Sequence, residues 1–363
     1  MKTIAVHAPR VTYYCGGAER YVLNLLVELS KRNSCISLVS YDAPKKSEWF
    51  RKFIKNFNGT VCLLKSSKMR SKFDKFSKAF SPSLWDEESK IFGEETKKFY
   101  RKNSFDLVVC HYAVDCLYLP KKTKICLHLH GLPDKRRKIE NKAIKIPNKI
   151  IAVSNYVGEG WKRLYKLKKK IYIVPNGISL EKKSFGKGNI DIIFFGRLIN
   201  VKGVNILLKS LRILNNQNIY PRTTIVGGGP EERNLINLAK KMKIKNINFL
   251  GRVKDKKLFN CISSSKISVF PSYKREGIMT TLLEASKYGS LIVASDSCSN
   301  KEFIKDNFNG ILFKPKDYKD MSVKLKAVLS DKGLRSKLIK NSFETLKNFT
   351  WKKQAKKIER IYY

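Results

Sequence analysis

Hydrophobic and polar positions follow two alternating periods along this chain. Short apolar runs of strand length are separated by stretches with apolar residues every three to four positions, and the first runs lie at 4–7, 105–110, 124–130, 149–154 and 170–174. This alternation predicts a parallel sheet with helices on both faces. The same pattern starts again at Ile190, with strands at 191–195 and 223–226. The sequence therefore predicts an α/β protein.

The stretch 265–296 is the clearest strand-helix-strand unit. An apolar run at 267–270 ends at Pro271, which lacks the amide hydrogen that a strand interior donates. A helix is then expected between Gly277 and Gly289, because glycine suits the left-handed turn that closes a helix, and a second buried strand follows. The amino end of such a helix has free amides and a positive dipole, which favours a phosphate ligand.

Two glutamates, Glu276 and Glu284, mark this helix. Their backbones would lie roughly 10 to 12 Å apart if the whole span is helical. That is about the distance from the sugar to the ribose of a nucleotide-sugar. The alternative is a loop glutamate and a solvated helix glutamate without function. A glycosidase is less favoured, since its two carboxylates flank one bond at about 5 to 9.5 Å.

The length of 363 residues favours two domains. We expect an N-terminal domain at 1–180, a C-terminal domain at 181–345, and a last helix at 346–363 that returns toward the first domain. A polar stretch after Pro175-Asn176-Gly177 would link the domains. The chain runs into a strand at once, no apolar run approaches the ~18 residues of a membrane span, and no C-x-x-C pair occurs. These features indicate a cytoplasmic protein.

Basic residues outnumber acidic ones by 75 to 30, which gives a net charge of +45. Such a surface attracts anionic membranes, polyanions and nucleotides. Apolar residues at the period of one helix face, with lysines around them, lie at Met69, Phe73, Phe76 and Phe80, and further basic clusters lie at 135–138 and 166–170. This face either packs on its own domain or binds peripherally to the inner face of the cell membrane.

Residues in the predicted loops of the first half are candidates for ligand contacts. The span 110–130 holds three histidines and three cysteines, but their spacing matches no common zinc pattern, so no metal site is predicted. Of His128 and His130, His130 is the better candidate for a ligand contact because it ends its strand. Gly16 and Gly17 open a helix and would let a ligand approach the backbone. Neither a dinucleotide-binding G-x-G-x-x-G nor a P-loop occurs.

In the second half, Arg197 and Lys202 follow the strand at 191–195. Ligands of doubly wound sheets bind at the carboxyl ends of strands, so these two cations are placed to bind a pyrophosphate. They could also be ordinary surface bases among many.

Taken together, these motifs make the chain resemble the retaining glycosyltransferases of family 4, which have the two-domain GT-B fold. The residues that carry the resemblance run in order along the chain: Gly16 to Arg20, His130-Gly131, Val153-Ser154, Pro175-Asn176-Gly177, Gly196-Arg197-Leu198 with Lys202-Gly203, Gly227 to Glu231, Phe249-Leu250-Gly251, Glu276 to Glu284, and Asn309-Gly310.

The resemblance implies two Rossmann-like domains that face each other across a cleft, with the acceptor bound by the N-terminal domain and the nucleotide-sugar donor by the C-terminal domain. Arg197 and Lys202 would hold the donor diphosphate, and Glu284 the ribose hydroxyls. The catalytic residues would be Glu276, at the sugar hydroxyls, and His130. The remaining donor-binding positions would be Gly17, Gly277, Ile278, Met279 and Thr280. The family often has Glu-Gly-Phe-Gly where this chain has Glu276 to Met279, so bulkier side chains stand near the donor. The family uses no essential metal, and no cofactor is expected.

The predicted function is that of a retaining hexosyltransferase in the synthesis of cell-surface polysaccharide or glycolipid. The donor is expected to be a UDP-sugar, with GDP-mannose as the second choice, and the acceptor to be lipid-linked or a glycan. The alternatives are a polyanion-binding or nucleic-acid-binding protein, motivated by the charge, and a nucleotide-sugar epimerase of similar fold. A nucleic-acid partner is the less favoured of these readings.

Overall fold

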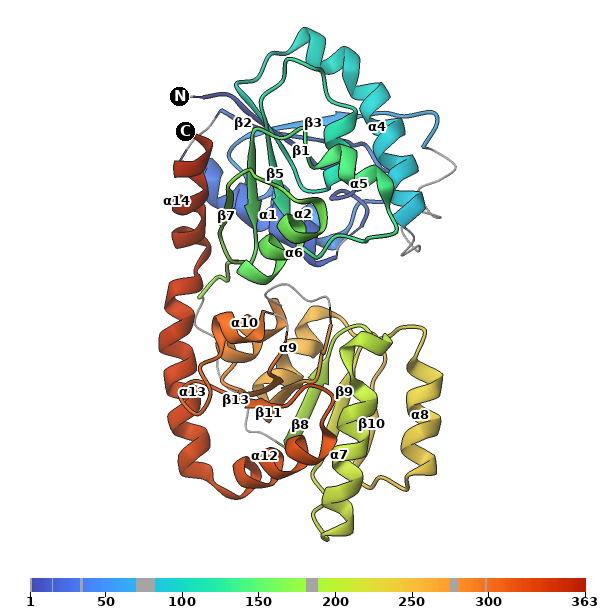
Figure 1. Cartoon of the computed structure of the whole chain (residues 1–363), viewed down its shortest axis with the longest axis vertical. Helices are drawn as coiled ribbons and strands as arrows, with labels where there is room; N and C mark the ends of the chain where they lie inside the picture. The colour runs from blue at the N-terminus through green and yellow to red at the C-terminus, as the bar shows by residue number, and fades with distance from the viewer. Residues whose placement is uncertain are drawn as a thin grey trace. The chain divides into compact units, whose positions relative to one another are not determined.

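The structure is a computed structural model that describes residues 2–14, 16–32, 35–69, 82–180, 189–274, 280–297 and 299–363. The chain forms two compact units (Figure 1). Unit 1 comprises Met1–Gly177 and Trp351–Tyr363, and unit 2 comprises Ile178–Thr350. Each unit has its own parallel sheet, so the prediction of two Rossmann-like α/β domains is confirmed.

The sheet of unit 1 has the strand order β3-β2-β1-β4-β5-β6-β7, with every pair parallel. Its strands are β1 (Ile4–His7), β2 (Ile36–Tyr41), β3 (Thr60–Leu64), β4 (Leu107–Cys110), β5 (Ile125–Leu129), β6 (Lys149–Ala152) and β7 (Ile171–Ile173). The chain winds outward from β1 in one direction and from β4 in the other. The point between β1 and β4 is therefore a topological switch point, where open α/β sheets bind ligands.

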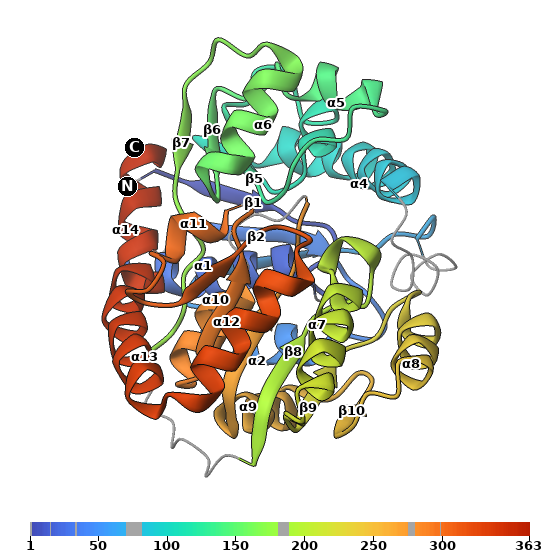
Figure 2. The same ribbon diagram turned by 60° about the horizontal axis from the view of Figure 1, so that its bottom comes forward.

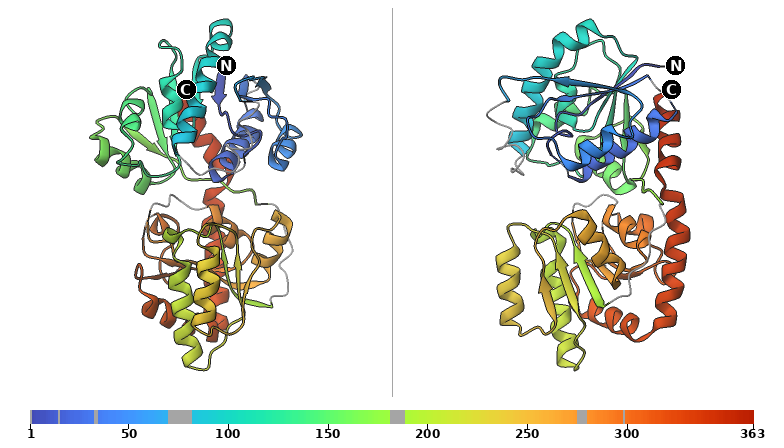
Figure 3. Two further views of the ribbon diagram at one scale, coloured as in Figure 1. Left: turned by 90° about the vertical axis from the view of Figure 1, so that its right-hand side faces the viewer. Right: turned by 180° about the vertical axis from the view of Figure 1, so that it is seen from behind.

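The helices of unit 1 cover both faces of this sheet. They are α1 (Gly17–Ser30), α2 (Glu48–Ile54), α4 (Pro82–Lys102), the 3₁₀ helix η1 (Ala113–Leu117), α5 (Lys138–Ala143), α6 (Asn155–Tyr165) and α14 (Trp351–Tyr362). In α1, Val22, Leu26 and Leu29 are buried at helical spacing, because one face packs on the core. The C-terminal helix α14 lies beside α1, close to the first strand (Figure 3).

Buried hydrogen bonds hold α14 on unit 1. The Tyr362 hydroxyl lies 2.9 Å from Nε2 of His128, and the Tyr21 hydroxyl lies 3.1 Å from Nδ1 of the same ring. A neutral imidazole has one donor and one acceptor nitrogen, so one tyrosine donates to His128 and the other accepts from it. His128 is 1% exposed and Tyr362 is 2% exposed. Gly177 also packs against α14, since a Cβ there would lie 2.5 Å from the ring of Trp351.

We expect Tyr362→Phe to lower the free energy of unfolding of unit 1 by about 1–3 kcal/mol, because it leaves a buried nitrogen of His128 unsatisfied. All four tryptophans of the chain, at positions 49, 85, 161 and 351, belong to unit 1, so tryptophan fluorescence in a urea titration reports on that unit alone. Tyr363→Phe is the matched control, since Tyr363 is 46% exposed. Equal stability of the two variants would show that α14 does not depend on this bond.

The sheet of unit 2 has the order β10-β9-β8-β11-β12-β13, again all parallel. Its strands are β8 (Ile190–Phe195), β9 (Thr223–Val226), β10 (Ile247–Phe249), β11 (Ser265–Phe270), β12 (Leu291–Ser295) and β13 (Ile311–Phe313). Its helices are η2 (Asn200–Lys202), α7 (Val204–Asn216), α8 (Glu232–Lys241), α9 (Asp255–Ser263), α10 (Thr280–Lys287), α11 (Asn300–Phe303), α12 (Tyr318–Ser330), α13 (Lys332–Leu346) and η3 (Lys347–Phe349). The switch point of this sheet lies between β8 and β11.

The two faces of this sheet have separate cores. Along β8, Ile192 and Phe194 face a core built with α7, α8 and α12, whereas Ile193 and Phe195 face a core built with α9 and α10 (Figure 2). Alternation of this kind is what a strand buried on both faces requires. It fixes the register of β8 and therefore the position of the loop that follows it.

The proposed membrane-facing stripe is wrong at its first residue. Met69 is 0% exposed and packs into the core of unit 1. Its backbone amide donates to Oγ of Ser66 at 3.0 Å, which turns the chain inward here. Phe73, Phe76 and Phe80 lie outside the described residues. Among the helices that the structure describes, none combines the length and the apolar character needed to cross a membrane.

Candidate functional site

The loops at the carboxyl edge of the unit 2 sheet are joined by backbone hydrogen bonds. Leu198 N donates to Gly228 O at 3.1 Å, and Gly227 N donates to Gly251 O at 2.8 Å, so the loops after β8, β9 and β10 form one layer. Gly227 has φ +133°, and a Cβ there would lie 1.8 Å from the carbonyl oxygen of Gly196. Only glycine permits this approach, which fixes the turn that presents Arg197.

A second set of contacts joins the loop after β8 to the loop after β11, across the switch point. Gly203 has φ +71°, and a Cβ there would lie 2.2 Å from Pro271 O. The Tyr273 amide donates to Val201 O at 3.2 Å, and its hydroxyl donates to Oδ1 of Asn200 at 2.6 Å. Arg197 is exposed and Lys202 is half-buried in this loop. Both cations therefore stand after β8, at the switch point, and their role in binding stays a prediction.

Helix α10 begins at the same edge and carries two of the predicted donor contacts. Thr280 and Glu284 are both half-buried and lie one turn apart, on one face of the helix. Leu282 and Leu283 on the other side are buried in the core. Gly289, with φ +72°, follows the helix in the left-handed conformation that the sequence predicted.

Four other predicted site residues, Glu276, Gly277, Ile278 and Met279, lie outside the described residues, so their roles stay predictions.

Sequence reasoning missed a serine cluster that joins the loops after β11 and β12. The hydroxyls of Ser295 and Ser297 both donate to Ser272 O, the latter at 2.7 Å. The sequence feature that could have indicated this cluster is the presence of serines at the ends of two predicted strands.

A cavity of about 550 Å³ lies farther along the same sheet, at the ends of β12 and β13. Three aspartates and three lysines line it: Asp296, Asp306, Asp320, Lys301, Lys314 and Lys324. Because charges of the two signs balance, this cavity does not favour an anion over a cation. The switch point, with Arg197 and Lys202, is the better site for a phosphate ligand.

In unit 1, His130 lies after β5, and His111 lies after the neighbouring strand β4. Nδ1 of His111 is 3.0 Å from Nε2 of His130. The ring of Tyr21, on α1, packs edge-on against His130 with centroids 4.6 Å apart. Gly17 is the exposed first residue of α1, and no atom lies within 4 Å of the place of a Cβ. The edge of unit 1 thus presents a fixed imidazole and an open helix start.

Burial determines the charge of these histidines. Burial lowers the pKa of His130 to about 4. Burial, with His128 and His130 nearby, also holds the pKa of His111 well below its usual value. Both rings are therefore neutral at pH 7, and the bond between them joins one donor nitrogen to one acceptor. His130 can orient a hydroxyl in this state, but it carries no positive charge to stabilise an anion.

A buried polar cluster lies at the same edge. Nε of Arg10 pairs with Oε2 of Glu88, and the hydroxyl of Tyr13 donates to the other oxygen of that carboxylate. Burial acts to lower the pKa of Arg10, but the charges of Glu88 and Asp115 outweigh it and raise that pKa. Burial raises the pKa of Asp115 to about 7, although Arg10 opposes the shift.

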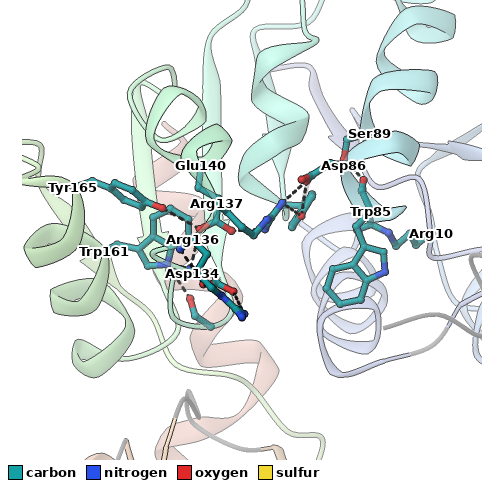
Figure 4. Close-up of polar contacts among 12 residues, drawn as sticks. Arg10, Trp85, Asp86, Ser89, Asp134, Arg136, Arg137, Glu140, Trp161 and Tyr165 are labelled. Atoms are coloured by element: carbon teal, nitrogen blue, oxygen red, sulfur yellow. Dashed lines mark hydrogen bonds and ion pairs between the residues drawn. The ribbon is translucent and has the colours of Figure 1, made fainter. Parts of the chain in front are cut away.

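Arg137 belongs to this cluster and is not available to a membrane surface, which corrects the interpretation of the basic stretch 135–138 at this one residue. Its side chain is 13% exposed and pairs with Asp86 and Glu140 (Figure 4). Lys135, Arg136 and Lys138 are exposed, with Arg136 at 78%. The sequence signal for the cluster was the run Asp86-Glu87-Glu88, a local acidic excess in a basic chain.

Within the parts of the chain that the structure describes, no group of three or more histidine, cysteine, aspartate or glutamate side chains is placed to hold a metal ion.

Two doubly wound parallel sheets, with cations at the switch point of the second, define a protein of the GT-B class. A family model described as Glycosyltransferase Family 4 matches residues 15–182, and one described as Glycosyl transferases group 1 matches residues 178–345. The two matches together span 15–345. The chain belongs to the GT-B glycosyltransferases of the family 4 type.

Individual relatives support this assignment. An alpha-1,4-N-acetyl-D-galactosaminyltransferase of Campylobacter jejuni, named for a PP-undecaprenol-linked glycan, is 34% identical over 170 residues, or 46% of this chain and 45% of that protein. The chain spans about half the length of the curated relatives it matches. Sucrose-phosphate synthase from Thermosynechococcus elongatus has the same fold, with a TM-score of 0.79, 17% identity and coverage of 100% and 98% of the two chains. Anabaena HepE, solved with UDP-glucose, matches with a TM-score of 0.75 and 14% sequence identity, and 99% of each chain is covered.

Proposed function

We propose that this protein transfers a hexose from a nucleotide-sugar to an acceptor with retention at the anomeric carbon, and that the donor binds at the switch point of unit 2. The observation that carries the proposal is the position of Arg197 and Lys202 in a loop fixed by Gly203 and Tyr273, at the edge of the sheet where α10 also begins. Cations and helix amides at one edge suit a diphosphate leaving group. A UDP-sugar is the first choice of donor, since HepE, of the same fold, binds UDP-glucose.

Binding of nucleotides tests this proposal. We expect UDP to raise the melting temperature more than GDP does, because binding to the folded state stabilises it. Arg197→Ala should reduce the shift of the melting temperature.

Nucleic-acid binding is the alternative that the charge of +45 motivates. Tight DNA binding that neither UDP nor GDP displaces, with no shift from either nucleotide, would favour that alternative.

Chelation is expected to leave activity unchanged. The proposed leaving-group contacts are side-chain cations and helix amides, and these need no metal ion. The measurement is turnover of the donor before and after treatment with EDTA and gel filtration. Loss of turnover on chelation, restored by Mg²⁺ or Mn²⁺, would require a metal in the reaction.

We further propose a lipid-linked or glycan acceptor and peripheral binding to the inner face of the cell membrane. The Campylobacter jejuni relative is named for an undecaprenol-linked glycan, and the exposed basic residues at 166–170 would attract an anionic surface. Each base near such a surface contributes about 1 kcal/mol.

Sedimentation with liposomes checks the membrane proposal. The protein should pellet with anionic vesicles at low salt, remain in the supernatant with zwitterionic vesicles, and dissociate as salt screens the charges. Charge reversal of Lys168 and Lys170 should weaken the binding. A protein that stays in the supernatant with anionic vesicles at low salt would point to an acceptor free in solution.

A further inference from the structure

The carboxyl edge of the unit 1 sheet carries acidic groups that the proposed donor site does not use. The first turns of α4 bring Asp86 and Glu88 to this edge, and η1 brings Asp115. Arg10 and Arg137 form ion pairs with Glu88, Asp86 and Glu140. Two guanidinium groups thus face three carboxylates. Among these paired side chains the carboxylates outnumber the guanidinium groups, although the exposed bases Lys135, Arg136 and Lys138 lie in the same stretch as Arg137.

One carboxylate oxygen at this edge is open to a hydrogen-bond donor, and a second is buried without one. Oδ1 of Asp86 accepts from the Tyr112 hydroxyl at 2.8 Å and from Nη2 of Arg137, whereas Oδ2 has no partner among the described residues. The Asp86 side chain is 22% exposed. Asp115 is 1% exposed, and its Oδ1 is buried without a partner in the described part of the chain. Buried acceptors of this kind need a donor from water or from a ligand.

Aromatic rings adjoin these oxygens. The rings of Trp85 and Tyr112 lie 6.1 Å apart between centroids, at 88°, and both side chains are half-buried. The guanidinium of Arg10 lies 5.3 Å from the Trp85 ring and 4.9 Å from the Tyr112 ring, which holds the two rings in place (Figure 4). Guanidinium groups therefore cover part of both rings, and the remaining apolar surface of the half-buried rings can contact C–H groups while Oδ2 of Asp86 accepts from a hydroxyl group.

We propose that Asp86, Trp85 and Tyr112 form a subsite that binds a neutral sugar residue of the acceptor, with Asp115 beneath them. The subsite rests on the proposed transferase function and specifies its acceptor. A sugar residue supplies a hydroxyl donor for the open oxygen of Asp86 and a C–H face for the rings. A phosphate would have to lie beside the Asp86 carboxylate, which disfavours it. The residue that receives the new sugar is therefore part of a glycan, and any lipid phosphate of the acceptor lies farther along the chain of sugars.

The decisive variant is Asp86→Asn. Tyr112 and Arg137 both donate to Oδ1, so they hold the amide oxygen in that place and turn the NH₂ group toward the subsite. An acceptor atom is thereby replaced by a donor with little change of shape. Asp106→Asn is the matched control, since it makes the same change of charge at the opposite end of β4, where Asp106 binds Thr3.

The probes are methyl glycosides of galactose, N-acetylgalactosamine, glucose and mannose, each paired with its sugar 1-phosphate, observed by saturation-transfer NMR at millimolar concentration. The wild type should bind at least one neutral glycoside and prefer it to the matching phosphate. Asp86→Asn should weaken that glycoside about tenfold, the usual effect of one lost charge-assisted hydrogen bond, and Asp106→Asn should not. Melting curves of each variant, with and without UDP, report folding and donor binding separately.

Each result decides a different point. The subsite is overturned if Asp86→Asn binds the glycoside as the wild type does, if the phosphates are preferred, or if no neutral glycoside binds. It is equally overturned if Asp106→Asn loses binding to the same extent. Binding of a glycoside that depends on Asp86, without any response to UDP or GDP, would instead keep the subsite and remove the donor proposal.

Discussion

Lys202→Ala is expected to slow release of UDP from the donor by about two to three orders of magnitude, which is the usual effect of removing a group that stabilises charge in the transition state. Arg197→Ala should have an effect of similar size. The diphosphate gains negative charge as its bond to the sugar breaks, and these two side chains stand at the switch point of unit 2. The loss should fall mainly on kcat, because the interaction strengthens as the reaction proceeds.

The control for this prediction is Lys209→Ala. Lys209 is exposed on α7, the helix that follows the same loop, and its ammonium lies 5.6 Å from the ring of Tyr318. Its removal makes the same change of charge close by and should leave kcat within about twofold, as expected for a surface site. Equal kcat in the Lys202, Arg197 and Lys209 variants would exclude the two cations from the reaction.

Glu276→Gln is expected to reduce transfer about a thousandfold or more while the protein stays folded. A carboxylate that orients the hydroxyls of the donor sugar, and supports positive charge at its anomeric carbon, has no substitute in a neutral amide. The measurement is kcat with circular dichroism as the check on folding. Glu344→Gln, at an exposed pair with Lys347, is the control. Near wild-type turnover of the Glu276 variant would remove this residue from the site.

The sequence was enough to predict most strands of the two sheets and the place of Arg197 and Lys202 after β8. Apolar runs at strand length predicted β1, β4, β5, β6, β7, β8, β9, β11 and β12, because parallel strands are buried on both faces. His130 was preferred because it ends its strand, and it is half-buried whereas His128 is buried. By contrast, β2, β3, β10 and β13 were not predicted from the sequence.

The errors came from partners that lie far away in the sequence. Arg137 reads as one of four consecutive bases, but its partner Asp86 is 51 residues earlier, and no local pattern shows that the two meet. Met69 fits the period of an amphipathic helix, yet the bond to Ser66 places it in the core. The acidic edge of unit 1 was missed for the same reason: its members come from the loop after β1 and from α4, η1 and α5, and only the fold assembles them.

The most direct test of the central claim is the anomeric configuration of the first sugar released. The protein is incubated with UDP-α-glucose, or with the UDP-sugar that gives the largest thermal shift, and slow transfer to water is followed by proton NMR before the anomers equilibrate. Catalysis by a retaining transferase predicts release of UDP together with the α-anomer, at a rate that falls in Lys202→Ala. The account would be contradicted if none of the nucleotide-sugars tested released its nucleotide, or if the β-anomer formed first.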